Sequence, residues 1–173
     1  PPVNQDPGRR RGRKTIMSAP ALCLPIVYLN GEFLPIEQAK ISPLDRGFIF
    51  GDGVYEVIPY YAGRGLRAVE HLKRLQRSLD ELDITNPYSM EQWQSVIGAL
   101  IEKNGGGNIA VYIQVTRGVA KRDFPPPAGL TQTVFLMANT LSTPKPEIYE
   151  NGIACVSLDD NRWLRCHIKA TAL

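Results

Sequence analysis

The feature that most limits the fold of this chain is a spacing of apolar residues that changes along it. Residues 54–61 are rich in side chains that favour strands. Apolar residues then recur at helical spacing over 70–82 and 89–104. Alternation typical of strands returns over 109–115, and 131–139 is again rich in strand formers. This order predicts an α+β fold in which two helices pack on an antiparallel sheet.

Each predicted helix has a single apolar face. In the first helix this face is formed by Leu72, Leu75, Leu79 and Leu82. Arg74 lies off that face, so periodicity alone places it on the solvated surface. The second helix begins with a capping-box pattern at Ser89 and Gln92, and Asn104 and Gly105 end it. Its apolar face is formed by Trp93, Val96, Ile97, Leu100 and Ile101.

Turn signals divide the chain into segments. Asn30-Gly31 predicts a hairpin between two short strands, so that the small α+β domain spans 26–140. Residues 141–151 contain two prolines and are predicted to be an interdomain linker. Residues 152–173 are then the start of a second domain, whose first sheet begins within 152–158. Residues 1–16 are rich in Pro, Gly and Arg, which predicts a disordered basic tail.

Composition excludes several classes of protein. Apolar residues make up 43% of the chain and charged residues 21%, as in soluble globular proteins. The net charge of +3 comes from the basic tail, so the remainder is too nearly neutral to indicate a nucleic-acid partner. No segment approaches the roughly 18 apolar residues that a membrane span needs. Three widely spaced cysteines form neither a metal-binding pair nor a disulfide framework, which favours the cytoplasm.

Two glycine-containing segments contain candidate functional residues. Gly47, Gly51 and Gly53 predict a glycine turn that leads into the strand 54–61, or a close approach of backbone to a ligand. That prediction does not explain why Tyr55 and Glu56 stand where the strand begins. The connection 118–129 is long for two strands and ends in three prolines, which is typical of a functional or mobile loop that presents Arg122.

Residues 161–169 alternate in character and are predicted to be a strand. One face is apolar, and the other carries Trp163, Arg165, His167 and Lys169. A lysine beside other cations is shifted toward its neutral form, and a neutral lysine amine forms Schiff bases with carbonyl cofactors. Spacing alone favours a plainer interpretation, an amphipathic edge strand whose Arg and Lys face water.

Four motifs, in order along 26–173, add a resemblance to a known family. They are Asp45-Arg46-Gly47 with Phe50-Gly51-Asp52-Gly53-Val54-Tyr55-Glu56-Val57, then Glu70-His71-Leu72-Lys73-Arg74-Leu75, Gln114-Val115-Thr116-Arg117-Gly118, and Arg162-Trp163-Leu164-Arg165-Cys166-His167-Ile168-Lys169. This set resembles the class IV, fold-type IV pyridoxal-phosphate enzymes, and most closely the D-amino-acid transaminases. Four motifs in sequence are a far more specific signal than one.

The resemblance implies a role for individual residues. Lys169 is similar to the lysine that binds pyridoxal 5'-phosphate covalently and moves the proton, and Arg74 corresponds to the arginine that pairs with the cofactor phosphate. Tyr55 and Arg122 resemble members of the trap for the substrate carboxylate, in which the loop arginine comes from the partner subunit of a homodimer. Arg162 matches a residue near the active site. The implied partners are a D-amino acid and a 2-oxo acid.

The chain departs from the family pattern at three places. The family commonly has a histidine two positions after the loop arginine, whereas Phe124 follows Arg122 here. His167 stands where an acid is common. The resemblance implies that 152–173 is the start of a large cofactor-binding domain. The chain ends shortly after Lys169, and in the family most phosphate-binding groups come later, so the isolated chain is expected to be inactive. The alternatives are a branched-chain aminotransferase, which Val57 disfavours, an aminodeoxychorismate lyase, and a non-catalytic truncated domain.

Overall fold

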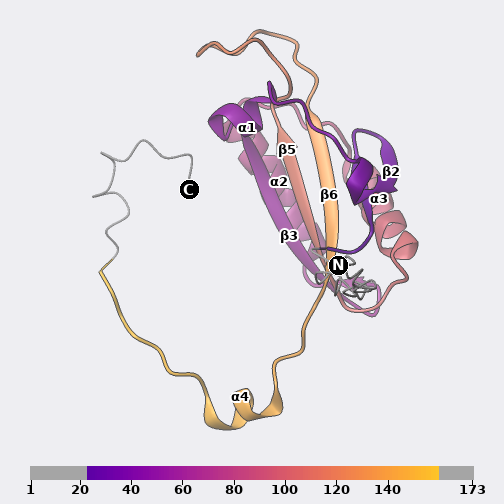
Figure 1. Ribbon diagram of the computed structural model, residues 1–173, viewed down its shortest axis with the longest axis vertical. Coiled ribbons are helices and arrows are strands. Elements are labelled where there is room, and N and C mark those ends of the chain that lie inside the picture. Colours follow the sequence, from indigo (N-terminus) through magenta and orange to yellow (C-terminus); the bar gives the residue numbers. More distant parts are fainter. Residues whose placement is uncertain (1–22, 160–173) are drawn as a thin grey trace, which may run out of the picture.

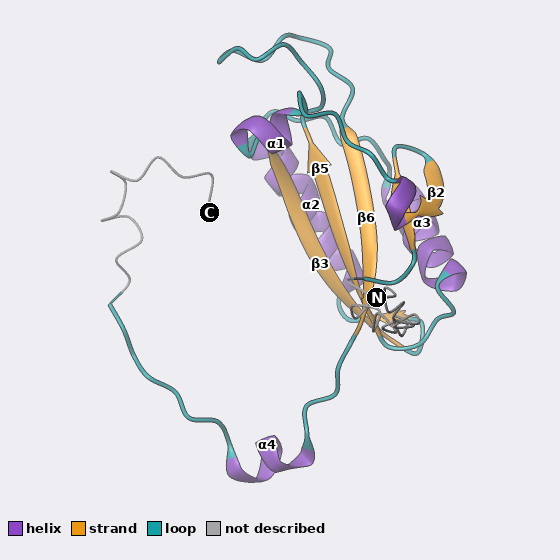
Figure 2. Cartoon of the chain, viewed as in Figure 1, coloured by secondary structure: helices purple, strands orange, loops and turns teal. Residues whose placement is uncertain are grey.

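The computed structural model describes residues 23–159, in which two long helices lie on one face of a six-stranded sheet (Figures 1 and 2). All adjacent strands are antiparallel, which confirms the predicted α+β fold. The elements are β1 (Ile26–Leu29), β2 (Glu32–Pro35), a turn of 3-10 helix (Ile36–Gln38), α1 (Arg46–Phe50), β3 (Gly53–Tyr61), β4 (Arg64–Gly65), α2 (Ala68–Glu81), α3 (Met90–Lys103), β5 (Ile109–Thr116), β6 (Thr133–Thr140) and α4 (Pro146–Asn151).

The strand order is β2-β1-β6-β5-β3-β4. The hairpin between β1 and β2 turns at Asn30 and Gly31, which both have positive φ, and this confirms the predicted turn. β3 pairs with β5 from Gly53 opposite Thr116 to Tyr60 opposite Ile109. On its other side, within residues 23–159, β3 pairs only through its last two residues, with β4. The start of β3 and the end of β5 therefore lie at the same end of the sheet.

The core lies between the sheet and the two long helices. α2 packs on β3, and α3 packs on β1 and β6, so each helix covers a different part of the sheet. α3 begins with the predicted capping box at Ser89 and Gln92 and ends at Asn104. The prediction that Leu82 belongs to the apolar face of α2 is wrong, because the helix ends at Glu81. Leu82 is 41% exposed, and Ile84 is buried instead.

A short helix, α1, replaces the predicted simple glycine turn. Asp45 caps its start, since its side chain accepts a hydrogen bond from the Gly47 amide. Gly51 ends it in the left-handed conformation, with φ of 67°. Gly53 has a different role, because a Cβ there would meet the Val115 carbonyl oxygen at 2.7 Å. The close approach that this glycine permits is therefore to strand β5.

The segment after β6 leads away from the sheet (Figure 1). The predicted linker 141–151 contains one short helix, α4, whose residues are all exposed. Residues 152–159 form no strand within the described chain, so the predicted first sheet of a large domain is not seen there. Among residues 23–159, no helix combines the length and apolar character that crossing a bilayer requires.

Candidate active site

Tyr55 lies on the face of the sheet that the helices leave uncovered. Successive side chains of a strand point to opposite faces, and Tyr55 is 58% exposed while Glu56 is 3% exposed. The Tyr55 ring stacks on Tyr112 of the neighbouring strand β5, with ring centroids 5.8 Å apart. Tyr55 also lines a pocket of about 450 Å³ that includes Gln114 of β5 and Ser78 of α2. The pocket therefore joins the open face of the sheet to the edge of α2.

Glu56 faces the opposite way and forms an ion pair with Arg74 on α2. Arg74 donates through Nε and Nη2 to the two carboxylate oxygens, at 2.5 and 2.8 Å. His71 Nδ1 lies 2.9 Å from Glu56 Oε2. Burial raises the pKa of Glu56, but the hydrogen bonds from Arg74 and His71 outweigh burial and hold this pKa below its usual value. Glu56 is therefore a buried, ionised carboxylate that orients Arg74.

Periodicity placed Arg74 on the surface, and its side chain is indeed 57% exposed, but Glu56 fixes one edge of its guanidinium. Arg74 also lines a pocket of about 410 Å³ along α2. This pocket is lined by Arg67, Glu70, His71, Lys73, Arg74 and Arg77. Four cations against one carboxylate form a donor set that fits a phosphate, which arginine binds through paired N–H groups.

Arg122 lies in the loop between β5 and β6, at the same end of the sheet as the start of β3. Its side chain packs on two aromatic rings, with Cζ 5.6 Å from the Phe50 centroid and 5.8 Å from the Phe124 centroid. Phe124, two positions after Arg122, is 77% exposed. The structure therefore brings Arg122 to α1 rather than into contact with Arg74.

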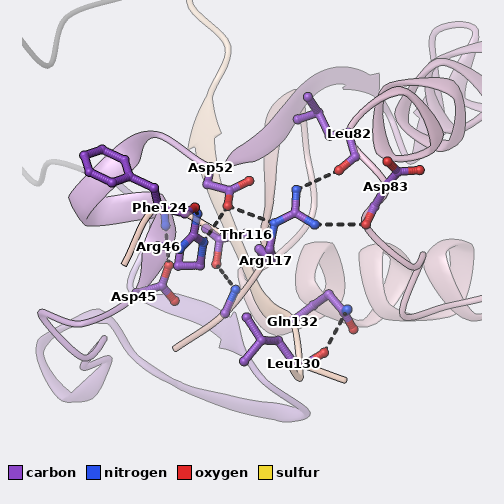
Figure 3. A network of polar contacts seen from close by, with 12 residues as sticks. Asp45, Arg46, Asp52, Leu82, Asp83, Thr116, Arg117, Phe124, Leu130 and Gln132 are labelled. Carbon is purple, nitrogen blue, oxygen red and sulfur yellow. Dashed lines mark hydrogen bonds and ion pairs between the residues drawn. The ribbon is translucent and has the colours of Figure 1, made fainter. Parts of the chain in front are cut away.

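A network of two arginines and one aspartate lies beside this loop (Figure 3). Asp52 Oδ2 accepts hydrogen bonds from Nε of both Arg46 and Arg117, at 2.7 and 2.8 Å. Burial raises the pKa of Asp52, but these hydrogen bonds outweigh burial and hold its pKa below the usual value. The side chains of Arg46 and Asp52 are 7% and 14% exposed. Asp52 is therefore a shared, ionised partner for two largely buried cations.

Sequence reasoning did not assign Asp52, Arg46 or Glu56 to the site. A usable signal was present at Glu56, since an acid at an inward position of an apolar strand requires a partner. The remaining candidates, Lys169 and Arg162, lie outside the described residues. Their roles stay predictions.

Comparisons with known proteins identify relatives of this chain. The family model described as amino-transferase class IV matches residues 53–173. A D-alanine aminotransferase of Staphylococcus haemolyticus is 40% identical over 149 residues, which cover 85% of this chain and 52% of that protein. The chain thus spans about half the length of the curated relatives that it matches.

Solved structures show the same fold. The branched-chain amino acid aminotransferase from Escherichia coli superposes with a TM-score of 0.65 at 23% identity, covering 68% of this chain and 41% of that one. The branched-chain aminotransferase from the thermophilic archaeon Thermoproteus uzoniensis, solved with norvaline, gives a TM-score of 0.61 at 23% identity, covering 68% of this chain and 41% of that one. At this identity both likenesses establish the fold alone.

Proposed function

The chain belongs to the class IV aminotransferase family, and on that premise we propose that the protein transfers an amino group between a D-amino acid and a 2-oxo acid with pyridoxal 5'-phosphate. The observation that carries this substrate class is the identity to D-alanine aminotransferases, which extends over most of the chain. Substrates of the branched-chain class are the alternative within the same family.

The fit of the cofactor rests on the cationic pocket at Arg74. Pyridoxal phosphate, when bound, supplies a carbonyl carbon and an electron sink that no side chain provides. Arg74 is proposed to hold the phosphate with its free edge, because Glu56 already occupies Nε and one hydrogen of Nη2. Lys169 is proposed to bind the cofactor carbonyl through Nζ and to move the proton of the reacting amino acid.

Recognition of the substrate carboxylate is assigned to Tyr55, Arg122 and Arg162. The loop of Arg122 extends beyond the end of the sheet (Figure 1), which supports a role for this arginine toward a partner subunit of a homodimer. A guanidinium pairs with a carboxylate through two parallel N–H groups, which suits this role. We place the protein in the cytoplasm, where the free thiols of Cys23 and Cys155 are stable.

Borohydride reduction in the presence of pyridoxal phosphate, followed by peptide mass mapping, tests this function. We expect a stoichiometric pyridoxyl adduct on Lys169 in a form that spans the whole length of the relatives. We expect none on the 173-residue chain. No adduct on the longer form would contradict the enzyme assignment, and a stoichiometric adduct on the 173-residue chain would contradict the expected need for the later groups.

Substrate assays on the same longer form distinguish the two substrate classes. With 2-oxoglutarate as amino acceptor, D-alanine is expected to react and L-leucine to react far more slowly. The reverse preference would replace the D-amino-acid assignment with the branched-chain one.

A further inference from the structure

The loop 118–129 is attached to the rest of the protein at its first residues through the backbone. The Arg46 amide donates to the Gly118 carbonyl at 2.9 Å, and the Ala120 amide donates to the Leu44 carbonyl at 3.3 Å. Asp45 and Val119 form an isolated antiparallel bridge between the same two segments. The chain that leads into α1 therefore holds the start of the loop.

Beyond Ala120, the hydrogen bonds that attach the loop come from one side chain. Within the described residues, the hydrogen bonds that join 121–128 to the rest of the molecule both come from Arg46. Its Nη1 donates to the Asp123 carbonyl at 2.9 Å and its Nη2 to the Phe124 carbonyl at 3.2 Å. These carbonyls belong to the two residues that directly follow Arg122. Arg46 therefore fixes the backbone on which the Arg122 side chain stands.

An aromatic ring links the two arginines as well. The Cζ of Arg46 lies 4.7 Å from the centroid of the Phe50 ring, and the Cζ of Arg122 lies 5.6 Å from the same centroid. Phe50 is the last residue of α1, and Arg46 is the first. One short helix thus supplies both the donor that holds the loop backbone and the ring that contacts the loop arginine.

Asp52 and Arg117 connect this arrangement to α2. Arg117 shares Asp52 with Arg46, and its Nη1 and Nη2 donate to the carbonyls of Asp83 and Leu82 at the end of α2 (Figure 3). Because Asp52 accepts from Nε of Arg46, it fixes the plane of the guanidinium and therefore the direction of its other N–H groups. A cation without this planar fork cannot donate to all three acceptors in the same geometry.

We propose that Arg46, oriented by Asp52, is a positioning residue for Arg122. It holds the loop so that the Arg122 guanidinium is already placed before a carboxylate binds, which lowers the ordering cost of binding. The role of Arg122 in this statement rests on the proposed function. The attachment of the loop by Arg46 does not, and the two are tested separately.

Hydrogen exchange measures the attachment directly. In Arg46→Lys and Asp52→Asn, amides in 119–128 are expected to exchange about tenfold faster, because the loop opens more often. Amides in β5 (110–115) report whether the variant is folded and are expected to stay protected. The matched control is Arg64→Lys, which changes an exposed arginine at the β3–β4 turn and is expected to leave 119–128 unchanged. Unchanged exchange in both Arg46→Lys and Asp52→Asn, with β5 protected, would overturn the proposal.

Kinetics on the form with the length of its relatives measure the positioning. In Arg46→Lys, the KM for a D-amino acid is expected to rise roughly tenfold while kcat changes little. This pattern is expected when a substitution weakens a contact that is equally strong in the ground state and the transition state. The KM for an amine without a carboxylate is expected to stay unchanged. A raised KM in Arg122→Ala with an unchanged KM in Arg46→Lys would overturn the positioning role. An unchanged KM in Arg122→Ala would instead overturn the proposed carboxylate clamp, and hydrogen exchange then decides the loop attachment alone.

Discussion

Arg74 and Glu56 form a side-on, two-point ion pair between α2 and β3, in which the carboxylate is buried and the guanidinium is half exposed. The carboxylate cannot rotate away into water, so it determines which edge of the guanidinium remains available. Arg74 also lines the cationic pocket along α2. The same strand presents Tyr55, the preceding residue, on the opposite face, so β3 separates the two binding functions proposed for this site.

The first prediction concerns the coupling between Glu56 and Arg74. A double-mutant cycle with Glu56→Gln, Arg74→Met and both changes, measured by urea unfolding, is expected to give a favourable coupling. The matched control is the exposed pair of Arg67 and Glu70, whose Nε–Oε1 distance is 3.4 Å and whose side chains are 73% and 55% exposed. Solvent screens such a pair, so its coupling is expected to be smaller. Equal couplings for both pairs would contradict the prediction.

The second prediction concerns acid stability. The pKa of Asp52 lies below its ordinary value of about 3.9, so the unfolded chain binds a proton more readily than the folded one. The free energy of unfolding is therefore expected to decrease as the pH falls from about 5 through the depressed pKa. Asp52→Asn removes this contribution, so its stability difference from the unchanged protein should shrink over the same range. Urea unfolding at a series of pH values measures it.

The control for this pH dependence is Glu102→Gln, which changes an exposed carboxylate of α3. This variant also removes one negative charge, so it reports the general effect of a charge change without the hydrogen bonds that Asp52 accepts. The stability difference between Asp52→Asn and the unchanged protein could instead stay constant down to about pH 3. In that case the hydrogen bonds from Arg46 and Arg117 do not lower the pKa of Asp52.

The third prediction concerns Arg122 as the carboxylate clamp. In a form with the length of its relatives, Arg122→Ala is expected to raise the KM for amino acids and to lose on the order of 2 kcal/mol in kcat/KM, because a charged two-point pair is removed. Lys121→Ala removes the neighbouring exposed cation and is expected to have little effect. An equal loss for an amine substrate without a carboxylate would remove the assignment.

The fourth prediction concerns Gly118, where the loop leaves β5. Its φ is +103°, and a Cβ at this position would overlap the Thr131 carbonyl oxygen. Gly129, at the other end of the loop, has φ of +73° with no atom near its Cβ position. Gly129→Ala is therefore expected to cost about 1 kcal/mol from backbone conformation. Gly118→Ala is expected to cost more than about 2 kcal/mol, since it adds a steric overlap. Thermal or urea unfolding compares the two, and an equal cost would contradict the assigned contact.

Sequence periodicity predicted most of the described fold, because its elements are long enough to repeat their apolar pattern. The capping box at Ser89 and the turn at Asn30 specify local geometry directly, and both predictions are confirmed. α1 has five residues, too few to show a helical period, so the sequence predicted only a turn. Leu82 continued the apolar spacing of α2 beyond the helix end, and spacing contains no information about that end when no capping residue marks it.

Sequence patterns predicted less of the candidate site than of the fold. Periodicity assigns Arg74 to a face of its helix but cannot show that Glu56, eighteen positions earlier, lies opposite it. Local patterns drew attention to Tyr55 and to the loop of Arg122, but only the family resemblance gave them a role. Arg74 and Arg162 were identified by the resemblance alone. The network of Arg46, Asp52 and Arg117 joins segments up to 78 positions apart and depends on how α1 meets β5, which no local pattern specifies.

The incomplete pairing of β3 has a consequence for aggregation. In the described chain, the outer side of β3 pairs only at Tyr60 and Tyr61, so most of this strand is a sheet edge that another extended chain could join. Pro59 lies on this edge, and its carbonyl accepts a hydrogen bond from the Leu66 amide at 2.8 Å, on the side away from β5. Because the N–H and C=O of a strand residue point the same way, the missing N–H of Pro59 leaves the ladder with β5 intact. An incoming strand would meet no donor at Pro59, which disfavours strand pairing at this position of the edge.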